Sequence, residues 1–425
     1  MMAMAKRALI LGCFSLILTL ETGYFARQGV AGILRLLGDA AFYANDQPTS
    51  WRRYRQAVRW GGDPERLEVD MVEMLLFGLA QQETGVKILT AVPPERAVPI
   101  ARRLIVRRLR DTPYRADYWS LASDLYRSEA RERRQKTPID LAALGEDPLE
   151  NLLPEDWLGI AAREVSSRLE PNNYLYPDLL AETFLEAGSP SAAAKYCRLS
   201  VAAFPDLDAH SYLWAPDLAP DLLEAAIGGF EDARSSDSMI SMVQIETDAG
   251  RLLVHHRQYR RALPYLERAV RLVPDDYDAQ MELGLAKHRL NDFQGAIERL
   301  EQASRILPQQ PWPHYFLGLS RTGLGDIDGS ITEFRKAKVN GARTTDLFRA
   351  LGEALEKAGQ SAEAAREFKA AANLNPGDAD AWSALLAFSV RHPEAGAASE
   401  ACARLLALRP QDRGYSDICA SLRKE

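Results

Sequence analysis

Cysteine is scarce in this 425-residue chain, which has only Cys13, Cys197, Cys402 and Cys419. Four cysteines are too few for a disulfide framework in a chain of this length, and no Cys-x-x-Cys motif occurs. Cys402 and Cys419 would pair if the last helix folds back on its neighbour, but their spacing alone does not decide this. The six histidines show no metal-ligand spacing, so we expect no metal site.

Familiar catalytic signatures are also absent. The chain contains no G-x-x-x-x-G-K-[ST], no H-E-x-x-H and no G-x-S-x-G. The stretch GLGDIDG at 323–329 is superficially like a phosphate loop, but it follows no predicted strand, and a turn between two helices explains it better. We therefore expect no catalytic residues, no cofactor and a protein that is not an enzyme.

No segment alternates apolar and polar residues at period two over any length, so we expect almost no sheet. The composition, 47% hydrophobic and 26% charged, excludes a disordered chain and predicts a large core. The net charge is unevenly distributed along the chain. Residues 1–136 hold 22 Lys+Arg against 15 Asp+Glu, a net charge of +7. Since the whole chain carries −7, residues 137–425 carry −14. The arginine-rich stretch 101–110 is interpreted as a helix lying over a core edge; the alternative is contact with anionic headgroups or an acidic partner.

Small residues recur every 34 positions through the second half of the chain. The first phase holds Gly250, Gly284, Gly318 and Gly352. The second holds Ala262, Ala296, Ser330 and Ala364, and the third holds Ala269, Ala303, Ala337 and Ala371. The units close at Pro274, Pro308, Pro376 and Pro410. Glycine inside a helix costs about 1 kcal/mol relative to alanine, so its repetition predicts that paired helices come closest at these positions.

The pattern resembles the tetratricopeptide repeat family. Its Leu-Gly pair is matched at 283–284, 317–318 and 351–352, and its first large residue by Trp382. Its aromatic slot is filled by Phe334 and Phe368, and more loosely by Leu266 and Leu300. The resemblance implies an all-α fold, a right-handed α-solenoid of stacked helical hairpins. It is specific over 243–412, with units 243–276, 277–310, 311–344, 345–378 and 379–412.

In this family the first helix of each hairpin lines a concave face that binds protein partners. Carrying that face across by phase gives the partner-binding candidates Gln244, Thr247, Arg251, His255, Met281, Leu285, His288, Arg289, Trp312, Tyr315, Leu319, Arg349 and Glu353. Aromatic side chains, methionine and arginine are favoured interface anchors. Trp312 and Tyr315 fit equally well as packing residues on the next repeat. The lysine- and asparagine-lined clamp of chaperone-binding members is not matched, because Thr247 and Arg251 replace it.

The N-terminus carries a further signal. Lys6 and Arg7 precede a mostly apolar run, and residues 8–25, as a helix, would be about 27 Å long. That length is close to the minimum for crossing a bilayer, and no A-x-A cleavage site follows. We interpret residues 1–26 as a signal anchor with a transmembrane helix, rather than a cleaved signal peptide that would leave a periplasmic protein. The basic flank places the remaining chain on the exported side, and the lack of any N-x-[ST] sequon favours a bacterial periplasm.

The regions between these signals are less regular. Residues 27–136 are expected to be helical and basic, with degenerate repeats as one interpretation. Residues 137–242 are expected to form a connector, one repeat-like unit at 174–207 and an irregular insert, and residues 413–425 a C-terminal cap.

Two hypotheses on function remain open. The first is a membrane-anchored scaffold that binds protein partners through the concave face of 243–412, contacts the membrane through residues 8–25 and binds no nucleic acid. It would organise a cell-envelope complex for secretion, polysaccharide export or a similar task. The alternative is a structural or enzymatic subunit of a membrane complex, with its active region in 27–240.

Overall fold

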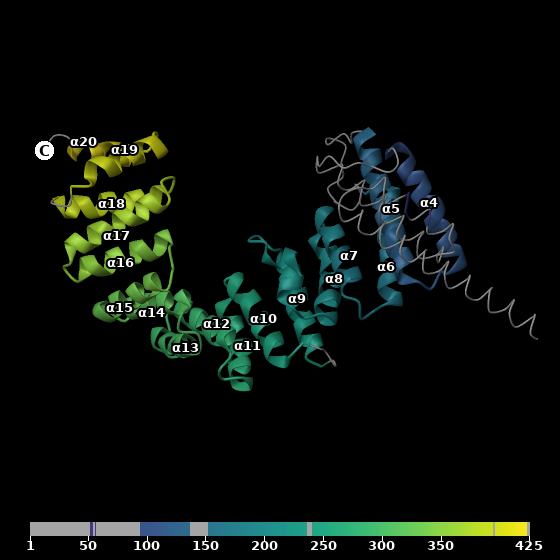
Figure 1. Cartoon of the computed structure of the whole chain (residues 1–425), viewed down its shortest axis with the longest axis horizontal. Coiled ribbons are helices and arrows are strands. Elements are labelled where there is room, and N and C mark those ends of the chain that lie inside the picture. The colour runs from purple at the N-terminus through teal and green to yellow at the C-terminus, as the bar shows by residue number, and fades with distance from the viewer. Residues whose placement is uncertain are drawn as a thin grey trace, which may run out of the picture. The chain divides into compact units, whose positions relative to one another are not determined.

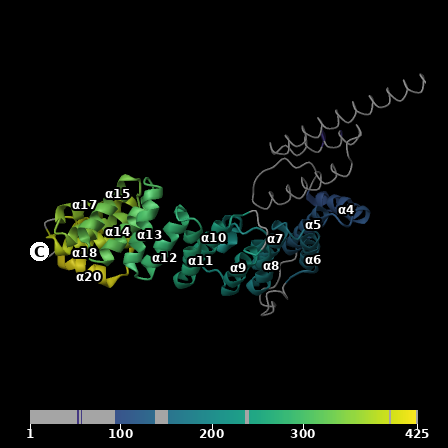
Figure 2. The same ribbon diagram turned by 90° about the horizontal axis from the view of Figure 1, so that it is seen from below.

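The computed structural model describes residues 52, 53, 56, 94–136, 152–235, 240–393 and 396–422. Within these ranges every regular element is a helix and no strand occurs, so the predicted all-α fold is confirmed for this part of the chain. The chain divides into two compact units, the first formed by 1–204 and 219–229, the second by 205–218 and 230–425. Figure 1 and Figure 2 show the helices of each unit stacked one after another.

The first unit contains a run of antiparallel helices. They are α4 (Pro94–Asp111), α5 (Ala116–Lys136), α6 (Pro154–Leu169), α7 (Leu175–Glu186) and α8 (Pro190–Ala203). Each helix packs against the next one in the sequence. A further helix, α9 (Pro220–Ala233), begins in this unit and ends in the second.

The arginine-rich helix α4 packs against α5. Ala101 and Ile105 are buried, whereas Arg103 and Arg107 are exposed. Arg102 pairs with Glu129 of α5, its Nε donating to Oε1 over 2.8 Å. The helix therefore lies along the edge of a core with its arginines outside, as the favoured interpretation of the sequence expected.

The second unit is an array of five helical hairpins followed by a single helix. The hairpins are α10–α11 (Met242–His255, Tyr259–Leu272), α12–α13 (Tyr277–Arg289, Phe293–Ile306), α14–α15 (Pro311–Gly323, Ile327–Val339), α16–α17 (Thr345–Lys357, Ser361–Leu374) and α18–α19 (Ala379–Arg391, Ala398–Leu408), and α20 (Arg413–Leu422) ends the array. Four of the second helices end just before Pro274, Pro308, Pro376 and Pro410, because proline lacks the N–H that a continuing helix needs.

The repeated glycines lie where the two helices of a hairpin touch. A Cβ added to Gly250 would be 2.5 Å from Leu266, and one added to Gly318 would be 2.5 Å from the ring of Phe334. The corresponding distance is 2.7 Å for Gly284. The small residues of the other two phases are all buried. The predicted close contact between paired helices is therefore present, and its packing offsets the helix-propensity cost of the glycines.

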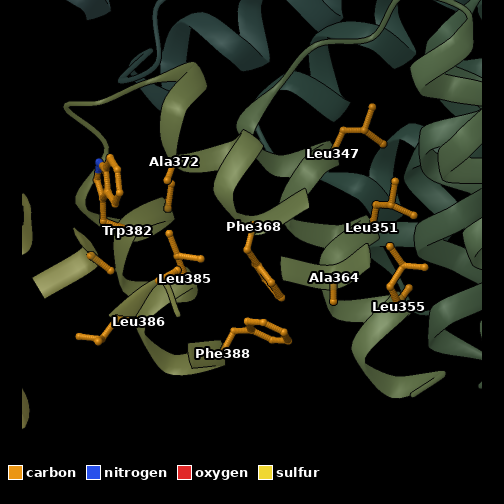
Figure 3. Packing of buried hydrophobic residues seen from close by; sticks show 14 of the residues in the cluster. Leu347, Leu351, Leu355, Ala364, Phe368, Ala372, Trp382, Leu385, Leu386 and Phe388 are labelled. Atoms are coloured by element: carbon orange, nitrogen blue, oxygen red, sulfur yellow. The ribbon is translucent and has the colours of Figure 1, made fainter. Parts of the chain in front are cut away.

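Each hairpin also packs on the next, which gives a continuous core. Figure 3 shows Phe368 of α17 between Leu351 of α16 and the α18 side chains Leu385 and Phe388. The rings of Phe368 and Phe388 lie 5.0 Å apart, and both are buried. A single hairpin leaves one apolar face uncovered, so stacking supplies the burial that one repeat lacks.

The turns inside the first four hairpins each have a residue with positive φ at the same position. Gly325 and Gly359 have φ of +82° and +76°, in the left-handed region that glycine adopts without strain. Arg257 and Asn291 occupy the same position of the two preceding hairpins, with φ of +59° and +63°. These four residues are spaced by 34, so the turn is repeated along with the helices.

A disulfide closes the end of the array. Cys402 of α19 and Cys419 of α20 are bonded, which resolves the question that their spacing left open. Both cysteines belong to the core cluster of the last repeats, and Tyr415 and Leu422 of α20 pack against it. Helix α20 thus covers the apolar face that the fifth hairpin would otherwise expose.

Candidate protein-binding surface on the first helices

The first helices of the hairpins form one layer of the second unit. Helix α10 contacts α12, α12 contacts α14, α14 contacts α16 and α16 contacts α18, in addition to the contacts within hairpins. First helices that approach each other in succession lie on the inner side of a curved array. The predicted candidates are therefore on the inner layer, although several of them are already engaged within the chain.

The α10 part of this layer is covered by residues 205–218 of the same unit. This segment contains two short 3-10 helices, η3 (Leu207–Ala209) and η4 (Ser211–Trp214), which both contact α10. Leu207 and Leu213 are completely buried. The segment is thus part of the core and packs on the helix that carries the α10 candidates.

Two consecutive histidines hold the backbone of this segment. Nε2 of His255 lies 3.1 Å from the carbonyl oxygen of Trp214, and Nε2 of His256 lies 2.8 Å from that of Leu213. Because a carbonyl oxygen only accepts, both imidazoles donate from Nε2–H. The ring of His255 also packs edge-on against the indole of Trp214, with centroids 5.0 Å apart.

Arg251 and Asp248 hold the same segment from the preceding turn of α10. The amide of Leu207 donates to Asp248 Oδ2 over 3.3 Å, and Arg251 Nη1 donates to Oδ1 over 3.0 Å. The Arg251 guanidinium lies over the Trp214 ring at 5.5 Å and within 3.8 Å of an Asp208 carboxylate oxygen. Burial raises the pKa of Asp248, and the bonds from Leu207 and Arg251 oppose that shift. Arg251 and His255 therefore bind an internal segment.

The α12 candidates divide between the interior and the surface. Met281 is half-buried and packs on the cluster of Ile297, Leu300 and Leu317, and Leu285 is half-buried as well. His288 is half-buried, with Nδ1 3.0 Å from Ser320 Oγ of the next hairpin. Burial, aided by the charge of Arg289, lowers the pKa of His288 to about 4, so its imidazole is neutral at pH 7. Arg289 itself is exposed.

Three predicted residues are linked to a fourth, Tyr315 of α14: Trp312 of α14 contacts its ring, and the charges of Arg289 of α12 and Arg349 of α16 act on its hydroxyl. We call these four the central surface. Trp312 is 43% exposed and stands edge-on to the Tyr315 ring, with centroids 6.2 Å apart. Tyr315 is half-buried, and its other side faces Phe334 at 6.1 Å.

Charges from both neighbouring helices surround the Tyr315 hydroxyl. Burial raises the pKa of Tyr315, Asp346 adds to the rise, and Arg349 and Arg289 oppose it. Arg349 is exposed and pairs with Asp346 over 2.9 Å and with Glu353 over 3.7 Å. Arg289 has no ion-pair or hydrogen-bond partner within the described ranges. The central surface therefore offers an exposed indole in edge-on contact with a tyrosine, whose hydroxyl is influenced by an unpaired guanidinium.

The remaining candidates are divided as well. Thr247 is buried and Leu319 packs on the core of the later hairpins. Gln244 is half-buried, and Glu353 is exposed. The side of the helix was identified from the sequence, but the covering of that side by a neighbouring hairpin or by residues 205–218 was not.

Sequence reasoning missed Asp248, His256 and Trp214 as a group. Asp248 and His256 each follow directly after a residue predicted for the inner face, Thr247 and His255 respectively. Trp214 belongs to the irregular insert, whose aromatic and proline content was the available signal. Among the described residues no group of three or more His, Cys, Asp and Glu is arranged to hold a metal.

Comparison with known proteins agrees with the repeat assignment over part of the array. Residues 247–311 match the family described as Tetratricopeptide repeat, so the predicted repeats are confirmed for this stretch. No curated protein matches the chain.

Several solved structures are similar to parts of the chain. MamA (residues 41 to the end) from Desulfovibrio magneticus RS-1 is 18% identical, covers 41% of this chain and 99% of its own, and has a TM-score of 0.38. YrrB, described as a TPR protein with an unusual peptide-binding site, is 19% identical, covers 47% of this chain and 100% of its own, with a TM-score of 0.38. A thermophilic TPR protein from Thermus thermophilus is 20% identical, covers 42% of this chain and 97% of its own, with a TM-score of 0.34.

Proposed function

We propose that this chain is a protein-interaction scaffold whose second unit binds a partner protein across the central surface. The observation that carries the proposal is the exposed indole of Trp312, in edge-on contact with Tyr315, whose hydroxyl is influenced by the charge of the unpaired Arg289. Tryptophan, tyrosine and arginine are the residues on which binding free energy most often concentrates. A half-exposed indole fixed edge-on by a second ring loses little conformational entropy when a partner covers it.

The α10 end of the layer supports the proposal indirectly. Residues 205–218 are held on α10 by two kinds of contact. Two histidines of α10 and its C-terminal end donate hydrogen bonds to backbone carbonyls of the segment, and Arg251 lies over the indole of its Trp214. An irregular segment is thus accommodated on this layer by backbone hydrogen bonds and one aromatic contact. A partner segment on the central surface would use the same kinds of contact, with Trp312 supplied by the repeat instead of by the segment.

We further propose that the scaffold acts on the exported side of a membrane, in the assembly of a cell-envelope complex. The predicted span at residues 8–25 lies outside the described residues. None of the helices within the described ranges has the length and apolar character needed to cross a bilayer. Support for export comes from the Cys402–Cys419 disulfide, since such bonds persist in oxidising compartments and are rare in the cytosol.

Pull-down with the full chain tests the binding proposal. The test variant combines Arg289→Glu with Trp312→Ala, both on the first-helix layer. The matched control combines Arg260→Glu of α11 with Val339→Ala of α15, an exposed arginine and an exposed apolar residue on second helices. Arg251 is left intact because it holds residues 205–218. Partners lost from the test variant and kept by the control support the proposal, and equal recovery by both contradicts it.

Membrane attachment and export need their own experiment. We expect the full chain to stay with the membrane fraction in high salt, and deletion of residues 1–26 to release it. A membrane-impermeant thiol reagent, applied to whole cells after reduction, is expected to label Cys402 and Cys419. Labelling that appears only after cell lysis would place the repeats on the cytoplasmic side and refute export.

A further inference from the structure

A second surface of the repeat array has the features of a binding site. A cleft of about 650 Å³ lies where the end of α9, the start of α10 and the end of α11 meet, on residues that all belong to the second unit. Its size is within the range of about 300–1,000 Å³ found for ligand sites. None of the central-surface residues lines it.

A buried ion cluster forms part of the wall of this cleft. Glu246 is 2% exposed, and its Oε1 accepts from Arg268 Nε over 2.9 Å and lies 3.0 Å from Arg234 Nε. Oε2 lies 2.9 Å from Arg268 Nη2 without accepting a well-aligned hydrogen bond. Arg268 also stacks over the Tyr265 ring at 4.7 Å. Two guanidinium groups are thus fixed in place by one carboxylate before any ligand arrives.

The cleft keeps hydrogen-bond donors for an anion. Among the described residues, Arg234 pairs only through its Nε, with Glu246, so its two terminal nitrogens have no partner there, and Arg271 has none at all. Three arginines and two glutamates line the cleft, so its net charge is +1. A monoanionic carboxylate balances that charge, whereas a dianionic phosphate would leave excess negative charge beside Glu231. Arginine forms paired hydrogen bonds to carboxylates, which suits this role.

Apolar side chains stand beside these arginines. Leu272 follows Arg271 directly and is 52% exposed, and Met242 of α10 is 40% exposed. A small carboxylic acid would leave much of this apolar surface in water, but a protein segment would cover both side chains while it placed a carboxylate on Arg271.

We propose that this cleft binds a partner polypeptide through a segment in which one acidic side chain stands beside apolar ones. The carboxylate pairs with Arg271 and the terminal nitrogens of Arg234, and the apolar side chains lie on Leu272 and Met242. The site is separate from the central surface and goes beyond the function proposed above, so each can fail without the other.

Fluorescence anisotropy with the full chain tests the site. The probes are labelled Ala-Leu-Glu-Leu-Ala amide and the same peptide with glutamine or phosphoserine in place of glutamate. A charge-assisted hydrogen bond is expected to make the glutamate peptide bind about tenfold more tightly than the glutamine peptide. Arg271→Glu should remove that difference, and Leu272→Ser should weaken both peptides. Arg260→Glu, an exposed arginine of the same helix outside the cleft, should change nothing.

Five results would overturn the proposal, and four of them concern the peptides. These are no binding of the glutamate peptide at millimolar concentration, equal affinity for the glutamate and glutamine peptides, equal effects of Arg271→Glu and Arg260→Glu, and tighter binding of the phosphoserine peptide. Displacement of the probe by free hexanoate as readily as by unlabelled peptide would assign the cleft to a small carboxylic acid instead. Circular dichroism of each variant shows that the helices are intact.

Discussion

Gly318 lies against the ring of Phe334, so close that a Cβ on Gly318 would be 2.5 Å from Cδ1 and Cε1 of that ring. Phe334 is completely buried and faces Tyr315 of the central surface on another side. The ring therefore lies between Gly318 and Tyr315, shielded from solvent. Helices α14 and α15 can approach this closely only because residue 318 is glycine, which has a hydrogen atom in place of a side chain. The position of Phe334 against Tyr315 of the central surface depends on the same approach.

Replacing Gly318 with alanine adds a methyl group that overpacks the hairpin, at a cost of about 1–3 kcal/mol. The gain in helix propensity, about 1 kcal/mol, offsets part of that cost, so we expect a net destabilisation of the second unit of up to about 2 kcal/mol. Urea denaturation followed by circular dichroism measures the change. Gly352→Ala should cost less, since its nearest contact to the Phe368 ring is 3.1 Å. Gly377→Ala, with its nearest neighbour at 3.6 Å, is the control and should be neutral. Equal effects at all three positions would contradict the steric explanation.

His256→Ala is expected to loosen residues 205–218 from α10. The substitution leaves the Leu213 carbonyl without its donor beside a fully buried side chain, at a cost of about 1–3 kcal/mol. His255→Ala is the matched comparison and should cost less, since His255 is exposed and its bond is longer. Hydrogen exchange at residues 205–218 should speed up markedly in the first variant and slightly in the second. The reverse order would show that the contacts of His255 with Trp214 hold the segment more firmly than the bond from His256 to Leu213.

Loss of the Cys402–Cys419 bond is expected to free helix α20. The bridge closes a loop with a sequence separation of 17, for which the chain-entropy estimate is about 3 kcal/mol. The double substitution to serine and chemical reduction of the native chain should lower the free energy of unfolding by similar amounts. Proteolysis near residues 409–412 should become faster in both. Cys197 is buried and forms no disulfide, and Cys197→Ser serves as the control that leaves this cleavage unchanged.

Glu282 should make the array less stable as the pH rises towards neutrality. Burial raises the pKa of Glu282 from 4.5 to about 7, with Asp278 adding to the shift and Arg251 opposing it. The folded state therefore holds this proton more tightly than the unfolded state, so stability is lost as the pH increases from 4.5 to about 7. Glu282→Gln should flatten this part of the pH profile of urea unfolding and raise stability at pH 7. An unchanged slope would show that the carboxyl is ionised throughout.

His288 should act in the opposite direction. Its pKa is lowered from 6.5 to about 4, so the unfolded state takes up the proton first, and stability falls as the pH decreases from 6.5 towards 4. His288→Gln should remove this decline, and the imidazole signals of the native protein should titrate near pH 4. An imidazole midpoint near the ordinary value would mean that His288 is accessible, and would return it to the set of partner-binding residues.

The repeats could be predicted because their packing requirement is itself periodic. Gly284 and Ala296 must be small for the same reason as Gly318 and Ser330, so the requirement is visible in the sequence alone. The turns were only partly visible: Gly325 and Gly359 show the left-handed position, but Arg257 and Asn291 adopt it without any glycine to indicate it. The residue type therefore indicates this turn conformation only where the position is occupied by glycine, which adopts a positive φ without strain.

The site was harder to predict than the fold. Helical phase placed Arg251 and Trp312 on the same layer, which the structure agrees with. Whether such a side chain is free depends on residues far along the chain that follow no period. Arg251 is engaged because Leu207 and Leu213 bury themselves beside α10, and nothing periodic indicates that placement. The pairing of Cys402 with Cys419 likewise could not be predicted without knowing where α20 packs. A sequence separation of 17 does not determine that position.

Photo-crosslinking in living cells tests most directly whether the central surface binds a partner. A photoreactive phenylalanine analogue replaces Trp312 in one strain and Val339, an 84% exposed residue on the second helix of the same hairpin, in another. We predict a discrete crosslinked protein from position 312 that disappears when Arg289→Glu is added, and no such product from position 339. The same product from both positions, or none from position 312, would contradict the account.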